Sequence, residues 1–322
     1  MSRLRFTLFE PTALSPHHLF HLAREAEQIG FDSFALNDGT FQMQETRGLY
    51  PYSSDKTPNW DRGAPFYEPM TILPAVAMQT ERIQVYPAVI KLPLHHPLTL
   101  AKQVATAAVM SGDRFALGVG ASWAPEEYEF CGVDWAKRGI IMTESIEALR
   151  LLLTGEMVEY HGKVIDFGPV MARPAPRLPV KIFVGGHKEP SLRRAARLAD
   201  GWIAAGPIPI EDVRAHIDRL RQLCDEYGRD WSKFEIHAYP RDVVTLDDYR
   251  RLEEIGVTDA GTMPINAGGR IVMDQSTRQR LLGQRVDAAR DVESIYDTSP
   301  PTTKIDAINR FAEEIMSHWT DR

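Results

Sequence analysis

Short apolar runs alternate with segments of helical spacing along the whole sequence, and this alternation restricts the fold more than any other feature. The runs lack the polar–apolar alternation of a half-exposed strand, as is typical of parallel strands buried on both faces. We predict strands at 3–9, 32–36, 83–90, 114–120, 180–186, 201–206, 234–239 and 257–263.

Between these runs, apolar side chains recur at helical spacing. The predicted helices are 16–29, 98–110, 190–199, 210–227, 246–255 and 303–317. For the first helix we expect Ser15 as cap, Pro16 in the first turn and Gly30 at the end. In the fifth helix of this set, Asp248 follows Thr245 at the spacing of a capping box.

Eight strands, each followed by a helix, predict an α/β fold of the (β/α)8 TIM-barrel type, with 1–322 as one domain. A doubly wound sheet is the alternative fold, but it would show fewer strands or a domain break. Long insertions at 40–66, 121–137 and 264–302 follow strands, and such loops build the C-terminal mouth of a barrel. Residues 156–167 are predicted to form a hairpin that turns at 161–162, away from that mouth.

Composition and charge exclude several kinds of partner. With 43% hydrophobic and 25% charged residues, the chain resembles an ordinary soluble enzyme, and its net charge of −7 argues against nucleic-acid and membrane-surface partners. We find neither a signal segment nor an apolar run long enough to span a membrane. Two cysteines, Cys131 and Cys224, are expected to be free thiols, so we expect a cytoplasmic protein with a small-molecule substrate.

The stretch "VKIFVGGHKEP" ends an apolar strand in Gly185, Gly186 and His187 before a helix that Pro190 opens. Glycines permit close approach to the backbone, and the free amides of a helix start bind anions, most often phosphate. A tight turn that needs glycine for its geometry alone explains the stretch equally well. Both interpretations remain open at this point.

The stretch "GVGASW" at 118–123 invites comparison with a dinucleotide-binding loop. We reject that comparison because Trp123 stands where the third glycine belongs. At the end of a barrel strand, Gly118 and Gly120 would instead let a flat ligand lie against the backbone, or serve packing within the barrel.

Asn37 and Asp38 stand where the second strand ends and a long loop begins. A carboxylate there could bind a heterocycle or transfer a proton. The alternative is a simple turn, for which Asp38–Gly39 is well suited. The position at the mouth of a barrel favours the functional interpretation.

Other charged residues near the predicted mouth have structural explanations. Glu126 and Glu127 begin a helix, where acids complement the helix dipole. Arg193, Arg194 and Arg197 could reach an anion near Gly186, but arginines on an amphipathic helix are more often solvated.

Four histidines lie near predicted strand ends, so a metal-dependent hydrolase with a barrel fold remains a second possible class of function. These are His95, His96, His187 and His237. Against this class, the sequence has neither a His-x-His pair on a strand nor a His-Glu-x-x-His helix.

Three runs, "SGDRFALGVGASWAPEEYEFCGVDWAKRG", "EALRLLLTGEMVEYHGKVIDFGPVMARPAP" and "VKIFVGGHKEPSLRRAARLADGW", resemble the bacterial luciferase-like oxidoreductase family. They are most similar to its coenzyme F420-dependent branch, as are "YPYSSD" and "TERIQVYPAVIKLPLHHP". The resemblance covers most of residues 1–206 and fades after about residue 240.

This resemblance implies a TIM barrel, usually a homodimer, that holds F420 or FMN at its C-terminal mouth. It implies a phosphate at Gly185, Gly186 and His187, and a ring over Ala88–Val89, where the family often carries a non-proline cis peptide. It implies that the rest of the cofactor site is lined by Asn37, Asp38, Gly120, Ala121 and Ser122. The expected reaction is hydride transfer between C5 of F420 and an unsaturated or carbonyl substrate.

Two departures from the family pattern bear on this expectation. The F420 branch commonly has Asp-His at the end of the second strand, whereas Gly39 follows Asp38 here, so Asp38 is the catalytic candidate. The luciferases proper suggest an arginine just past the fourth strand, and Ala121 stands at that position. The alternative within the family is an FMN-dependent monooxygenase supplied by a separate reductase. For either reaction, substrate identity is expected to depend on the loops 40–66 and 264–302, and their aromatic residues Tyr50, Tyr52 and Trp60 suggest a partly apolar pocket.

Overall fold

Parallel strand pairing carries the chain around a TIM barrel. The computed structural model describes residues 3–10, 15–44, 46–47, 50–51, 66–240, 242–243, 245–263 and 301–319. The strands of the barrel are β1 (Arg5–Glu10), β2 (Ser33–Leu36), β3 (Gln84–Pro87), β4 (Ile90–Lys91), β5 (Leu117–Gly120), β8 (Ile182–Gly185), β9 (Gly201–Ile203), β10 (Glu235–Ala238) and β11 (Asp259–Thr262). They pair in the order β3-β2-β1-β11-β10-β9-β8-β5-β4, and a parallel bridge between Val85 and Phe115 joins β3 to the start of the β5 segment, which closes the barrel.

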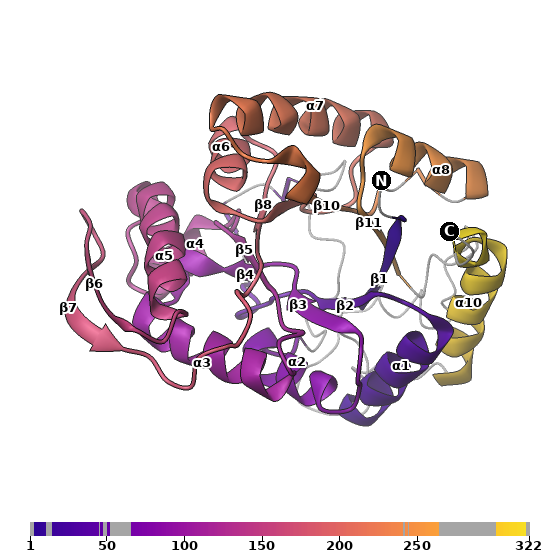
Figure 1. Cartoon of the computed structure of the whole chain (residues 1–322), viewed down its shortest axis with the longest axis horizontal. Coiled ribbons are helices and arrows are strands. Elements are labelled where there is room, and N and C mark those ends of the chain that lie inside the picture. The colour runs from indigo at the N-terminus through magenta and orange to yellow at the C-terminus, as the bar shows by residue number, and fades with distance from the viewer. Residues whose placement is uncertain are drawn as a thin grey trace.

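Helices surround these strands in chain order, as Figure 1 shows. They are α1 (Pro16–Ile29), α2 (Pro69–Ala77), α3 (Pro97–Met110), α4 (Pro125–Phe130), α5 (Arg138–Leu152), α6 (Glu189–Leu198), α7 (Ile210–Glu226), α8 (Leu246–Ile255) and α10 (Pro301–Glu314). Consecutive strands therefore place their carboxyl ends at one mouth, as in any barrel of this type.

The predicted strands are confirmed, with one instructive difference. The predicted strand at 83–90 is interrupted at Ala88–Val89, which separates β3 from β4. The predicted helices also match, although the predicted set lacks α2, which carries Pro74 in its interior, and α5.

Helix ends follow the predicted signals in most cases. Gly30 ends α1 in the left-handed conformation, and Thr245 and Asp248 form a reciprocal capping box on α8. Ser15 is the N-cap residue of α1, but its side chain makes no capping hydrogen bond, so that part of the prediction is wrong.

Two apolar cores explain why the strands lack clean polar alternation. On β1, Phe6 and Leu8 pack outward against the helices, in the large core between sheet and helices. Phe9 from the same strand joins a small core that also includes Tyr86 and Phe183. Because a strand alternates its side chains, this second set faces the barrel interior, and both faces of each strand are buried.

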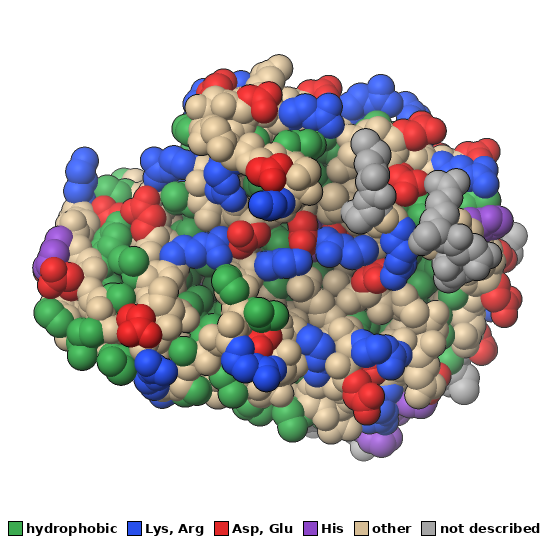
Figure 2. Space-filling view, viewed as in Figure 1, with side chains coloured by type: hydrophobic (Ala, Val, Ile, Leu, Met, Phe, Trp, Pro, Cys, Tyr) green, Lys and Arg blue, Asp and Glu red, His purple; other side chains and the backbone are tan. Residues whose placement is uncertain are grey.

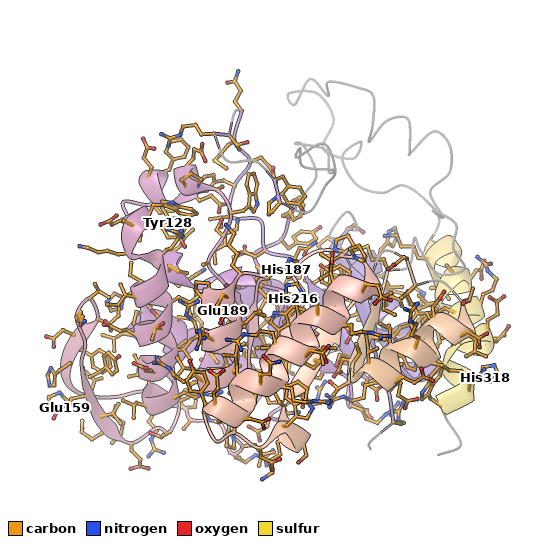
Figure 3. All side chains as sticks on the ribbon, turned by 90° about the horizontal axis from the view of Figure 1, so that it is seen from above. Tyr128, Glu159, His187, Glu189, His216 and His318 are labelled. Atoms are coloured by element: carbon orange, nitrogen blue, oxygen red, sulfur yellow. The ribbon has the colours of Figure 1, made fainter. Side chains whose placement is uncertain are left out.

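A hairpin extends from the barrel beyond α5 (Figure 1). It consists of β6 (Met157–His161) and β7 (Asp166–Met171), so the predicted hairpin is confirmed, although its connection spans 162–165 rather than two residues. Figure 3 shows Glu159 of this hairpin toward the opposite end of the molecule from Tyr128, which follows β5. The hairpin therefore lies away from the mouth, as predicted.

Large parts of two predicted mouth loops, 52–65 and 264–300, lie outside the described residues. The prediction that these two loops build the C-terminal mouth of the barrel therefore stays a prediction. Among the described residues, every helix is too short or too polar to cross a membrane. On the face of the molecule seen in Figure 2, basic and acidic side chains are interspersed rather than gathered by sign.

Candidate functional site

The interruption between β3 and β4 forms the centre of the candidate site. The peptide bond between Ala88 and Val89 is cis, as the family resemblance predicts. A Cβ added to Gly120 would lie 2.6 Å from Val89 Cγ2, and one added to Gly185 would lie 3.2 Å from Val89 Cγ1. Val89 therefore occupies the space left by two glycines on neighbouring strands. The segment predicted to hold the cofactor ring, Ala88–Val89, thus contacts the start of the segment predicted to hold the phosphate, Gly185–His187.

Gly118 has a packing role. A Cβ at this position would lie 2.1 Å from the carbonyl oxygen of Pro87, so the backbone of β3 occupies the space that a side chain would need. Of the two interpretations of Gly118, the structure supports packing within the barrel.

Strand register brings the predicted site residues together. Leu36 pairs with Pro87, Lys91 pairs with Gly120, and Val119 pairs with Val184. The residues that follow these positions therefore succeed one another around the same mouth. This set is Asn37, Asp38, Ala88, Val89, Gly120, Ala121, Ser122, Gly185, Gly186 and His187.

Lys91 connects three strand ends at this mouth. Its main-chain N–H donates to Asp38 Oδ2 at 3.2 Å, and its ammonium lies 3.2 Å from Thr40 Oγ1. The same ammonium is paired with the carboxylate of Glu127 on α4, which also accepts a hydrogen bond from the Ser122 hydroxyl. Because the side chains of Lys91 and Glu127 are only 12% and 5% exposed, this is a buried ion pair.

The structure corrects the interpretation of Glu126 and Glu127. Both do lie in the first turn of α4, where acids complement the helix dipole. Both are also buried, and each is paired with a cation from another segment, Glu126 with Arg47 and Glu127 with Lys91. Their role is to join segments that are far apart in sequence, which a helix-start signal does not reveal.

Asp38 and His95 influence each other at the mouth. Burial raises the pKa of Asp38 above its usual value, against the opposing effect of the Lys91 charge. Burial lowers the pKa of His95, while Asp38 and Glu68 act in the opposite direction. Both shifts favour the uncharged forms, so this part of the mouth holds groups that can gain or lose a proton.

Gly39 has no room for the histidine of the family pattern. A Cβ at this position would lie 2.6 Å from the ring of Phe66. His95 is the imidazole that acts on Asp38 instead. The sequence singled out His95 only as a possible metal ligand, and its relation to Asp38 was missed because the two residues are 57 positions apart.

The Gly185–His187 turn is held from behind by two ring nitrogens. Trp202 Nε1 donates to the carbonyl oxygen of Gly186 at 2.8 Å, and His216 Nε2 lies 3.0 Å from the carbonyl oxygen of His187. Gly186 has a φ of +121°, a backbone angle that residues with a side chain rarely adopt. A Cβ at this position would lie 2.8 Å from Ser191 Oγ. The turn therefore requires glycine, and its two carbonyl oxygens are already occupied by hydrogen bonds.

The arginines of α6 are engaged elsewhere. Arg193 is paired with Glu189 and Glu226, and Arg194 donates to Thr143 Oγ1 and to the carbonyl oxygen of Gly139. The idea that these arginines reach an anion near Gly186 is therefore not supported by their contacts.

An aromatic pair lies beside the mouth. Tyr50 packs edge-on against Trp123 with 5.4 Å between ring centroids, directly after the site residue Ser122. The partly apolar substrate pocket suggested by these aromatic residues stays a prediction. The other two aromatic residues named for it, Tyr52 and Trp60, lie outside the described residues.

A group of side chains that could coordinate a metal ion lies at a different place, inside the barrel. Glu235, His237 and Asp259 have ligand atoms within 4.8 Å of one another. Arg5 lies 2.7 Å from Glu235 and 2.6 Å from Asp259, and Lys181 is also paired with Glu235. Two cations thus already neutralise the two carboxylates, so this group has the composition of a structural charge network rather than of an open metal site.

Similarity to known proteins identifies the class. The family model described as luciferase-like monooxygenase matches residues 3–313. The Mycobacterium tuberculosis protein Rv0940c is 38% identical over 296 residues, covering 92% of this chain and 93% of the relative.

Two solved structures share the fold at low identity. The F420-dependent tetrahydromethanopterin reductase from Methanopyrus kandleri has a TM-score of 0.70 at 15% identity, covering 99% of this chain and 100% of the other. The FMN-bound oxygenating constituent of 3,6-diketocamphane monooxygenase from Pseudomonas putida has a TM-score of 0.54 at 19% identity, covering 77% and 71%. This chain belongs to the luciferase-like monooxygenase family.

Proposed function

We propose that this protein is an F420-dependent oxidoreductase that transfers a hydride to or from a small organic substrate with an unsaturated or carbonyl group. The proposal rests on three segments that lie at the same mouth of the barrel. Asp38, the cis Ala88–Val89 segment and the Gly185–His187 turn follow neighbouring strands at the same mouth.

The residues at this mouth fit a flat ring with a phosphate-bearing chain. A ring would lie against Ala88 and Val89, and the glycines beside Val89 keep that surface free of longer side chains. A phosphate would bind at the Gly185–His187 turn, where a side chain on Gly186 would collide with Ser191. The remaining contacts would come from Asn37, Asp38, Gly120, Ala121 and Ser122. When bound, F420 supplies the hydride chemistry.

In this proposal Asp38 holds or releases the proton that accompanies hydride transfer to a carbonyl. Burial raises its pKa, and a raised pKa brings a carboxylic acid closer to the operating pH of a general acid. Lys91 orients Asp38 through its main-chain N–H and, with Glu127, keeps the adjoining strand ends in place. His95, near Asp38, can exchange that proton with solvent.

The second candidate is an FMN-dependent monooxygenase that receives reduced flavin from a separate reductase. The fold shared with an FMN-bound monooxygenase favours it. Against it, Ala121 stands where the luciferases suggest an arginine for the flavin phosphate, so that charge-assisted contact is missing.

One experiment separates the two candidates. Reduced F420 carrying deuterium at C5 is mixed with the protein and a panel of enones and aldehydes without oxygen. We expect deuterium in the product and reoxidised F420. If product forms only with reduced FMN and oxygen, and contains an oxygen atom from O2, the monooxygenase is correct.

A further inference from the structure

Trp202 lies on the helix side of the Gly185–His187 turn. It belongs to β9, which pairs with β8 so that Trp202 stands opposite Val184. Its side chain is fully buried in the large core between sheet and helices, and its Nε1 donates to the carbonyl oxygen of Gly186 at 2.8 Å. An indole N–H can only donate a hydrogen bond, so the direction of this contact is fixed.

The indole is itself held in place by α7. The ring of His216, a residue of α7, stacks on the indole of Trp202 with 5.5 Å between centroids and 10° between ring planes. Figure 3 shows His216 next to His187, and its Nε2 lies 3.0 Å from the carbonyl oxygen of His187. Two successive carbonyl oxygens of the turn are therefore directed toward the core and α7.

These contacts determine the direction of the peptide groups. In a trans peptide group, C=O and N–H point in opposite directions. The peptide group between His187 and Lys188 is trans, so the N–H of Lys188 points away from α7, to the side of the barrel mouth. The carbonyl oxygen of Gly186 points into the core, away from that mouth.

The start of α6 leaves two main-chain donors at this place. Pro190 has no N–H, and the N–H groups of Ser191 and Leu192 already donate to the carbonyl oxygen of Lys188. For the N–H groups of Lys188 and Glu189, the described part of the chain holds no acceptor. Free N–H groups of this kind bind anions at the start of a helix.

Glycine makes the adjoining peptide group easy to turn over. Gly186 has a φ of +121°, and without a Cβ it can reach other peptide orientations at little steric cost. If the peptide group between Gly186 and His187 turned over, its carbonyl oxygen would face the place where a phosphate is expected and would repel it. The present orientation therefore depends on a partner for this oxygen, and the indole is that partner.

We propose that Trp202 is a positioning residue for phosphate binding, whose indole N–H keeps the carbonyl oxygen of Gly186 turned away from the mouth. This inference rests on the proposed function, which puts the phosphate of a cofactor at this turn. Trp202 does not touch the ligand, because its side chain lies wholly within the core. The alternative is that the buried indole merely finds an acceptor, as such groups usually do, and then its N–H has no effect on phosphate binding.

A replacement that removes the N–H and little else tests this role. Site-specific incorporation of 3-benzothienylalanine at position 202 keeps two fused rings and has sulfur in place of the N–H. Trp202→Phe is the second variant. Trp231→Phe is the control, because Trp231 packs on Phe234 and begins the short helix before β10, on the side away from the mouth.

The peptide orientation is tested first, in the protein without cofactor. Crystal structures of the wild type, the benzothienylalanine protein and the control show where the carbonyl oxygen of Gly186 points. We expect this oxygen to leave its position in the benzothienylalanine protein, in all or part of the molecules, and to keep it in the control. A single unchanged orientation overturns the inference, whatever cofactor the protein uses.

The effect on phosphate binding is tested with ligand pairs that share a ring. FMN and riboflavin differ only in the phosphate, and F420 differs from its ribityl deazaflavin fragment in the whole phosphate-bearing chain. Titrations at about pH 8 keep the phosphate of FMN a dianion. For the pair that the wild type binds, we expect both variants at position 202 to lose about tenfold of the preference for the phosphorylated ligand. Affinity for the phosphate-free ligand should stay the same.

Three other results would contradict the inference in distinguishable ways. Equal loss of both ligands of a pair shows a merely structural role for Trp202, and the proposed phosphate site stands. A preference that persists although the carbonyl oxygen has moved shows that the phosphate binds elsewhere. A wild type that shows no preference for the phosphorylated ligand refutes the phosphate site of the proposed function, and the inference with it.

Discussion

The main-chain N–H of Lys91 donates a hydrogen bond to Asp38 Oδ2, while the side chain of Lys91 is ion-paired with Glu127. A single residue thus connects the end of β2 to α4 across the strand that resumes after the cis peptide. It holds the proposed acid–base group and the proposed ring surface in a fixed relation.

Replacement of Asp38 by Asn tests its proposed chemical role. The amide keeps the shape and can still accept from the Lys91 N–H, but it cannot exchange a proton. We expect turnover to fall by about 10²-fold or more with little change in cofactor affinity. The matched control is Asp247→Asn, an exposed aspartate on α8. If Asp38→Asn turns over like the control, Asp38 is not the acid–base group.

The Lys91–Glu127 pair should behave as a buried ion pair in a double-mutant cycle. Lys91→Met or Glu127→Gln alone leaves an uncompensated charge, and we expect each to lower the free energy of unfolding by about 3 kcal/mol. The double variant Lys91→Met/Glu127→Gln should be more stable than either single variant. Chemical denaturation measures all three.

The exposed pair Lys233–Asp230 provides the control for this cycle. Its disruption should change stability by less than about 0.5 kcal/mol. Equal effects for the two pairs would show that the Lys91–Glu127 pair is solvated in solution.

Gly186→Asp tests the turn as an anion site. The new carboxylate would repel a phosphate, and its Cβ would meet Ser191, so we expect cofactor affinity to fall by at least about 100-fold. Gly228→Asp is the control, because Gly228 also has a positive φ of 63° but has open space around it, after the end of α7. Unchanged cofactor affinity in folded Gly186→Asp would return Gly186 to a role in turn geometry alone.

His187 should make stability depend on pH in the protein without cofactor. Its pKa is about 4 in the folded chain and 6.5 in the reference state, so between these values the unfolded chain binds more protons. Its contribution is complete above pH 6.5 and is lost as the pH falls to about 4. Relative to His187→Gln, the wild type should lose up to about 3 kcal/mol between pH 7 and pH 4.

Urea denaturation of both proteins at several pH values measures this difference. A constant difference between wild type and His187→Gln across this range would show that the His187 ring is fully solvated in the folded chain.

The barrel was predictable because its signals are local. Apolar runs such as 180–186 and helix ends such as Gly30 and Thr245 depend on neighbours in the sequence, and the structure confirms them. The cis peptide at Ala88–Val89 followed from family resemblance rather than from periodicity, since the run 83–90 is typical of one strand, with Gln84 as its single strongly polar residue.

The charged part of the site was not predictable in the same way. Glu127 meets Lys91, and His216 meets His187, through strand register and helix packing that bring distant segments together. A helix-start signal explained Glu127 well enough on its own, and position 216 carries no local signal at all. Only the folded chain shows that such residues have partners.

The most direct test of the central claim is a side-by-side fluorescence titration of the purified protein with F420 and FMN at one ionic strength. We predict that F420 binds at least about tenfold more tightly than FMN, because Ala121 stands where the luciferases suggest an arginine for the flavin phosphate. Tighter binding of FMN would contradict it and assign this chain to the flavin-dependent monooxygenases of its family.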